Sequence, residues 1–233
     1  MHTKHLSNKV AHQKNSTPYT LKAKTLIETL YKRVDVDRDF LIFMNMKNEP
    51  TKISAQDAVD GAIHVAQYLI LKGLEKNDKV TIMLPTSIDF LYVYLGIIFA
   101  GGVPVPVSQP AGTNNLDKYL DNLSHIVKDS ESTFFITYDK MKMMVGGVKD
   151  KSFEFIFTSE INNKVIKKED YKTLPEVGPD DYALIQYTSG TTGKPKGVTL
   201  THNNLLHNIH GIGDALALGA DDVGISWLPM YHD

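Results

Sequence analysis

The segment from Thr188 to Gly197 has the composition of a phosphate-binding loop. Its sequence, TSGTTGKPKG, contains four hydroxyl side chains, three glycines and two lysines. Glycines let backbone amides approach an anion, hydroxyls donate hydrogen bonds, and ammonium groups supply positive charge. The segment follows the apolar run 182–187, which is typical of a buried strand. We therefore expect a polyphosphate ligand here, although the same residue types are also common in a solvated turn.

Two other nucleotide-binding motifs do not fit the sequence. A Walker loop has four residues between its glycines and a Ser or Thr after its lysine. Here two residues separate Gly190 from Gly193, and Pro195 follows Lys194. The glycine pair at 211–213 lacks the third glycine of a dinucleotide fingerprint and lies in an expected helix, so we interpret it as a packing feature.

The composition of the chain is that of an ordinary globular protein and excludes several functions. Of its 233 residues, 42 % are hydrophobic and 22 % charged, and the formal net charge of -2 would not attract nucleic acid. The absence of cysteine excludes disulfides, thiolate metal sites and a cysteine nucleophile, and a cytoplasmic location is expected. Residues 1–20 are polar, lack a secretory signal and are interpreted as a flexible leader.

The elements that position the loop are predicted by alternating strand-like and helical patterns. Expected strands are 40–46, 79–84, 103–107, 133–137, 153–157, 182–187, 197–200 and 223–228. Expected helices begin after Ser54 and Ser87, cover 116–128 and 138–145, and follow a Thr201 cap. This alternation predicts an α/β fold with mainly parallel sheets covered by helices.

The uncharged residues 90–107 have the length of a membrane span, but a Gly-Gly pair and two prolines interrupt them. A buried helix followed by an edge strand is expected there, and no membrane span. The polar stretch 158–179 is expected to be a surface connection, and it could divide the chain into two subdomains.

The sequence resembles the adenylate-forming superfamily of acyl-CoA synthetases, luciferases and peptide-synthetase adenylation domains. The resemblance is carried by the loop YTSGTTGKPKGV at 187–198 and by LPMYHD at 228–233, and it extends from about Phe40 to the end. Gln186 and Asp233 make the chain most similar to fatty acyl-AMP ligases. The resemblance implies that residues 21–233 are an incomplete N-terminal AMP-binding domain, without the C-terminal domain.

The reaction that the resemblance implies has two steps. A fatty acid carboxylate attacks the α-phosphate of ATP and releases pyrophosphate, and the acyl group then passes to a thiol. The thiol would be the phosphopantetheine arm of an acyl carrier protein or, in the alternative, coenzyme A. ATP and Mg²⁺ are the implied cofactors, with the metal ligands expected mostly beyond this chain.

The resemblance also assigns roles to particular residues. Those expected to bind ATP phosphates are Thr188, Ser189, Gly190, Thr191, Thr192, Gly193, Lys194 and Lys196. Lys196 would be the charged contact and Lys194 more solvent-facing. His232 would be the catalytic residue, beside the acyl carboxylate and the α-phosphate. No protein metal site is expected.

Several alternatives stay open from the sequence. The chain could belong to an acyl-CoA synthetase or an amino-acid adenylation domain, or act as a nucleotide- or acyl-binding module without turnover. The binding module is an alternative because further active-site residues are expected beyond Asp233. The chain alone is therefore expected to make no acyl-AMP. Tyr92, Tyr94 and Phe99 are expected in the core rather than in an acyl tunnel. The histidines at 202, 207 and 210 are expected to be packing or solvated residues.

Overall fold

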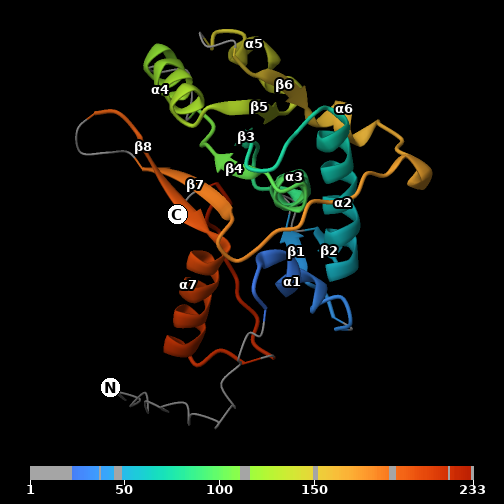
Figure 1. Cartoon of the computed structure of the whole chain (residues 1–233). Helices are drawn as coiled ribbons and strands as arrows, with labels where there is room; N and C mark the ends of the chain where they lie inside the picture. The colour runs from blue at the N-terminus through green and yellow to red at the C-terminus, as the bar shows by residue number, and fades with distance from the viewer. Residues whose placement is uncertain are drawn as a thin grey trace, which may run out of the picture.

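A four-stranded parallel sheet lies at the centre of the protein (Figure 1). The computed structural model describes residues 23–36, 38–44, 49–110, 116–148, 152–188, 193–219 and 221–231. The strands of this sheet are β3 (Lys79–Met83), β4 (Val103–Pro106), β5 (Ser132–Thr137) and β6 (Glu154–Phe157). Their spatial order is β4-β3-β5-β6, and each neighbouring pair is parallel. The predicted α/β class is confirmed.

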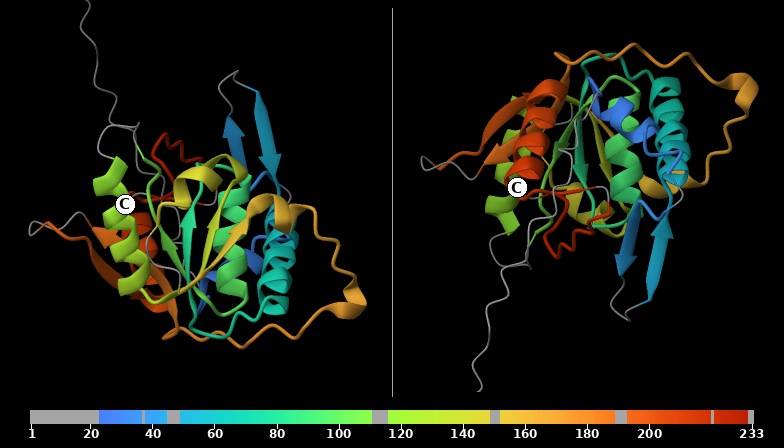
Figure 2. Two further views of the ribbon diagram at one scale, coloured as in Figure 1. Left: turned by 90° about the horizontal axis from the view of Figure 1, so that it is seen from above. Right: turned by 90° about the horizontal axis from the view of Figure 1, so that it is seen from below.

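Helices cover both faces of this sheet (Figure 2). One layer is formed by α2 (Ala55–Leu71) and α3 (Ile88–Phe99), and the other by α4 (Leu116–Asp129) and α5 (Lys142–Val145). Successive side chains of a strand point to opposite faces. Phe134 and Ile136 therefore join the first core, which lies beneath α2 and α3. Phe135 joins the second core, which lies beneath α4 and contains Leu123.

The remaining elements surround this centre. They are α1 (Leu26–Tyr31), β1 (Leu41–Met44), β2 (Pro50–Ile53), η1 (Asp139–Met141), α6 (Thr158–Asn162), η2 (Lys168–Asp170), β7 (Tyr182–Thr188), β8 (Lys196–Thr201) and α7 (His202–Ala215). β1 pairs with β2, and β7 with β8, as separate antiparallel hairpins. The sequence patterns had not indicated α1 or β2.

The segment 158–179 runs along the outside of α2 (Figure 1) and contains α6 and η2. The buried side chain of Gln67 ties it to α2 through two hydrogen bonds to the backbone of Lys172. The Lys172 amide donates to Oε1 at 2.6 Å, and Nε2 of Gln67 donates to the Lys172 carbonyl at 2.8 Å. Farther along, Lys76 donates to the carbonyl of Glu176.

The caps of α2 agree with the sequence. Ser54 Oγ accepts from the Asp57 amide at 3.0 Å, and the Ser54 amide donates to the Asp57 carboxylate at 2.9 Å. The Ser54 hydroxyl also donates to the Asp57 carboxylate at 2.6 Å, and this bond, together with the one from the Ser54 amide, lowers the pKa of Asp57. After the helix, Gly73 has a φ of +97°, the left-handed conformation that glycine adopts at C-terminal caps.

Two glycines allow α2 and α3 to pack closely. A Cβ on Gly96 would come within 2.5 Å of Val65 on α2. A Cβ on Gly61 would come within 2.6 Å of the Tyr92 ring on α3. These distances are far below normal van der Waals contact. The first core therefore depends on the absence of side chains at two positions.

Replacing Gly96 should test this packing. Gly96→Ala should lower the free energy of unfolding by about 1–3 kcal/mol, because the methyl overpacks the interface with α2. Gly211→Ala is the matched control in α7, where an added Cβ meets nothing within 4 Å, and it should raise stability by about 0.5–1 kcal/mol. Urea unfolding measures both changes. A stabilising Gly96→Ala would contradict the close packing.

Strand β4 lies at the edge of the parallel sheet, as its prolines predict. The amides of Val103 and Val107 donate to Asp78 and Ile82, on the β3 side. The alternation of a strand therefore turns the nitrogens of Pro104 and Pro106 away from β3, where a missing N–H leaves no ladder bond unmade. β7 packs beside β4 but, among the described strands, pairs only with β8.

Two expected strands need correction. The expected strand 223–228 is wrong: this segment forms no strand, and Trp227 is 89 % exposed. A strand needs a neighbour for its backbone hydrogen bonds, and none of the described strands pairs with this segment. The expected buried strand 182–187 is β7, which is only partly buried because Tyr182 is exposed.

The uncharged residues 90–107 contain most of α3 and all of β4. In the described parts of the chain, no helix has both the length and the apolarity needed to cross a membrane.

Candidate functional site

The β7–β8 hairpin brings together the described residues of the expected phosphate loop. Thr188 ends β7, Lys196 begins β8, and the two are paired across the hairpin. The loop is therefore closed at its base by a regular antiparallel ladder (Figure 1). Four residues of the same prediction, Ser189, Gly190, Thr191 and Thr192, lie outside the described residues.

The described loop residues are open to a ligand. Thr188, Gly193, Lys194 and Lys196 are all exposed. Gly193 has a φ of +97°, a conformation that residues with a side chain rarely adopt, and an added Cβ would meet nothing within 4 Å. No ion pair joins either lysine to another described residue. The loop thus offers two uncompensated ammonium groups and an accessible backbone, which suit a polyphosphate.

A cavity adjoins the base of the loop. It has a volume of about 440 Å³ and lies between α3, the end of β4, the hairpin and α7. Its lining residues are Phe90, Leu91, Tyr94, Pro106, Leu184, Gln186, Thr188, Val198, Leu200, Leu205, Asn208 and Met230. Most are apolar, whereas Thr188 belongs to the loop. The cavity could therefore hold an apolar group with one end at the phosphate loop.

Of the three aromatic residues expected in the core of α3, one also faces this cavity. Phe99 is fully buried, and Tyr92 and Tyr94 pack against the same core. Tyr94 lines the cavity, and burial raises the pKa of its hydroxyl. No hydrogen bond joins this hydroxyl to another described residue. Apolar spacing along α3 could not distinguish these roles, because core and cavity residues have the same chemical character.

The segment before His232 reaches the same cavity. The Met230 amide donates to Thr86 Oγ1 at 3.0 Å, just beyond the carboxyl end of β3, and Met230 lines the cavity. Tyr231 packs against the first core. His232 itself, the expected catalytic residue, lies outside the described residues. The two motif segments are thus brought to one cavity through Thr188 and Met230.

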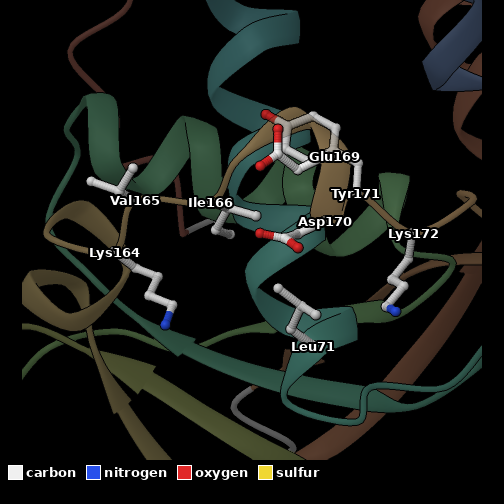
Figure 3. Close-up of a pocket in the computed structure, with 8 residues that line it drawn as sticks. All are labelled: Leu71, Lys164, Val165, Ile166, Glu169, Asp170, Tyr171 and Lys172. Atoms are coloured by element: carbon white, nitrogen blue, oxygen red, sulfur yellow. The ribbon is translucent and has the colours of Figure 1, made fainter.

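A second cavity has a different character. It has a volume of about 370 Å³ and lies between the end of α2 and the segment 164–172 (Figure 3). Its lining residues are Leu71, Lys164, Val165, Ile166, Glu169, Asp170, Tyr171 and Lys172. Charges of both signs meet there, and it contains no residue of either motif. We therefore place the candidate site at the first cavity.

The fit of the implied cofactors differs. The exposed lysines and the open backbone at Gly193 fit ATP phosphates. Among the described residues, no group of three or more His, Asp or Glu side chains could hold a metal ion.

The histidines of α7 differ in their surroundings. His202 is buried, and its Nδ1 accepts a hydrogen bond from the Leu26 amide at 3.2 Å. Burial lowers the pKa of His202, against a smaller opposing effect of the Asp181 carboxylate. The pKa of Asp181 is itself lowered, mainly by its hydrogen bond from Lys76. His207 is exposed and His210 half-buried.

His202 should make stability depend on pH. Because its folded pKa lies below the unfolded value, the unfolded chain binds the proton first as the pH falls. The free energy of unfolding should therefore decrease below about pH 6.5, by at most roughly 1.4 kcal/mol per pH unit, until the folded pKa is passed. His202→Asn, which keeps an acceptor for Leu26, should reduce this slope in urea unfolding, and the exposed His207→Ala should not. Equal slopes in wild type and His202→Asn would refute the assignment.

Comparison with known proteins identifies the family. The AMP-binding enzyme family matches residues 31–233, and the chain belongs to this family. It is 28 % identical over 218 residues to the medium-chain-fatty-acid–[acyl-carrier-protein] ligase JamA of Moorena producens, covering 90 % of this chain and 36 % of the relative. It is 31 % identical over 193 residues to the long-chain-fatty-acid–CoA ligase of Bacillus subtilis, covering 67 % and 33 %.

The fold comparison agrees. A structure from a study of fatty acyl-adenylate ligases of E. coli and L. pneumophila superposes with a TM-score of 0.83 and 25 % identity, covering 91 % of this chain and 38 % of that one. The fold is that of the N-terminal domain of adenylate-forming enzymes. The chain spans about a third of the length of the curated relatives described above.

Proposed function

We propose that this chain is the phosphate- and acyl-binding part of a fatty acyl-AMP ligase. In the proposed reaction a fatty acid is activated with ATP to an acyl-adenylate, and the acyl group is transferred to the phosphopantetheine thiol of a carrier protein. The observation that carries the proposal is the position of Thr188, which both closes the phosphate loop and lines the apolar cavity. A cytoplasmic location belongs to the same proposal.

The arrangement suits the first half-reaction. An acyl chain in the cavity would place its carboxylate near Thr188 and Met230, next to the phosphates on the loop. Lys196 and the loop amides would stabilise the negative charge that develops on the departing pyrophosphate. The protein would contribute mainly alignment of two anions and electrostatic stabilisation. Mg²⁺ would supply further charge neutralisation on the phosphates.

The remaining site assignments are part of the proposal. Ser189, Gly190, Thr191, Thr192, Gly193 and Lys194 would complete the phosphate contacts. His232 would follow Met230 and Tyr231 to the junction of carboxylate and α-phosphate. We further propose residues 21–233 as one adenylating domain after a leader at 1–20, with segment 158–179 connecting its two subdomains.

Removing the charge of Lys196 should weaken ATP binding. A charge-assisted hydrogen bond contributes about 1.5–3 kcal/mol, so Lys196→Ala should raise the dissociation constant of Mg²⁺-ATP by roughly ten- to a hundredfold. Lys164→Ala is the matched control, an exposed lysine of the second cavity. Titration calorimetry on the chain measures all three proteins. An unchanged constant in Lys196→Ala, or a weakened one in Lys164→Ala, would contradict the assigned site.

The acceptor separates the proposal from its nearest alternative. The relatives include both a carrier-protein ligase and a CoA ligase. With radiolabelled fatty acid, ATP and the complete gene product, we expect label on holo acyl carrier protein and little on coenzyme A. Efficient labelling of coenzyme A would favour an acyl-CoA synthetase instead. Activation of amino acids but not fatty acids would favour an adenylation domain.

A further inference from the structure

Helix α4 touches both arms of the hairpin at the base of the phosphate loop. On the β7 side, the Tyr187 hydroxyl donates to the Asp129 carboxylate at 2.7 Å. On the β8 side, His125 Nε2 lies 3.1 Å from the carbonyl oxygen of Pro195. Tyr187 is the last residue but one of β7, and Pro195 immediately precedes β8. One helix therefore holds the chain where it leaves the hairpin and where it returns.

The spacing along α4 makes these contacts possible together. His125 and Asp129 are four residues apart, so they lie on one face of the helix. A carbonyl oxygen can only accept, so His125 Nε2 carries the hydrogen in this contact. Pro195 has no amide hydrogen, and its carbonyl is the only backbone group it can offer. In this contact His125 Nε2 is therefore the donor and the Pro195 carbonyl oxygen the acceptor.

The Tyr187 side chain also lies against the neighbouring strand β8. Tyr187 is the cross-strand partner of Gly197. A Cβ on Gly197 would come within 3.0 Å of the Tyr187 ring and of Ile185, so the ring lies close against the glycine and an added side chain would have to displace a neighbour. Burial and then the bond to Asp129 raise the pKa of the Tyr187 hydroxyl, which therefore stays a donor at neutral pH.

The opposite face of α4 is anchored in the parallel sheet. Leu123, Ile126 and Val127 are buried in the core that also contains Phe135 and Val105. The two-stranded β7–β8 hairpin has no ladder to that sheet. Two-stranded hairpins are marginal alone. The contacts from α4 consequently join the ends of the loop to a helix that is packed in the core of the parallel sheet.

We propose that His125 and Asp129 are positioning residues that hold the two ends of the phosphate loop, at Pro195 and Tyr187, for ligand binding. They act through Pro195 and Tyr187 and do not themselves touch the nucleotide. A loop held in place before binding loses less conformational entropy when the ligand binds. The inference rests on the proposed function only for the identity of the ligand.

The test combines four variants of the chain with a control. His125→Ala and Asp129→Ala remove the two contacts, and Tyr187→Phe removes only the hydroxyl that Asp129 accepts from. His125→Gln keeps a side-chain N–H donor. His207→Ala is the control, an exposed histidine of α7. The readouts are amide hydrogen exchange of peptides spanning 186–198 and 55–71, the dissociation constant of Mg²⁺-ATP, and urea unfolding.

Loss of either contact should speed exchange in 186–198 and weaken ATP binding about three- to tenfold, as expected for one net hydrogen bond. Exchange in 55–71 and unfolding should change little. Tyr187→Phe should reproduce Asp129→Ala, while His125→Gln and His207→Ala should resemble wild type.

Three results would overturn the inference: unchanged exchange in 186–198, faster exchange with unchanged ATP affinity, or equally faster exchange in 55–71, which indicates global destabilisation. If His125→Gln does not behave like the wild type, His125 does not act as a hydrogen-bond donor to Pro195. If the wild-type chain binds no Mg²⁺-ATP, the proposed ligand is wrong, and exchange alone decides whether α4 holds the hairpin.

Discussion

The candidate site depends on a constraint at the edge of β4, where two proline nitrogens face away from the parallel sheet. Without amide donors at 104 and 106, the ladder of the sheet cannot continue into β7. The hairpin instead packs beside β4 as a sheet of its own. The cavity lies at this junction, since Pro106 lines it together with alternate residues of β7. Pro106 thus forms part of the wall of the space that would hold an acyl group.

The same separation explains why the hairpin needs support from α4. A loop on a hairpin that continued the parallel sheet would be fixed by the ladder. Here it is fixed by packing beside β4 and by side-chain contacts from a helix that belongs to the sheet's second core. A cavity and a phosphate loop that meet at Thr188 would suit the two substrates of the proposed adenylation.

The sequence predicted the features that depend on local interactions. The capping box at Ser54 and Asp57 marked the start of α2, and Gly73 marked its end. The Gly-Gly and proline interruptions separated α3 from β4. The glycine-rich turn expected between the strands 182–187 and 197–200 is confirmed as the connection between β7 and β8. Each of these signals lies within a few residues of the feature that it predicts.

What the sequence did not predict depends on distant partners. The apolar segment 223–228 has strand-like residues, but no described strand pairs with it. His125 and Pro195 are 70 residues apart, and neither residue type alone indicates their contact. The cavity was missed because its walls come from α3, β4, the hairpin and α7, whose apolar residues are indistinguishable from core residues in a one-dimensional pattern.

The central claim is that the apolar cavity and the phosphate loop form one site that meets at Thr188. Nuclear magnetic resonance titrations of the isotope-labelled chain test it directly, with decanoate and Mg²⁺-pyrophosphate as separate probes. Decanoate should shift the methyl signals of Leu184 and Val198, and pyrophosphate the amides of Gly193 and Lys196. The Thr188 amide should respond to both. Shifts at Leu71 and Val165 instead, or a Thr188 amide that responds to neither probe, would contradict the account.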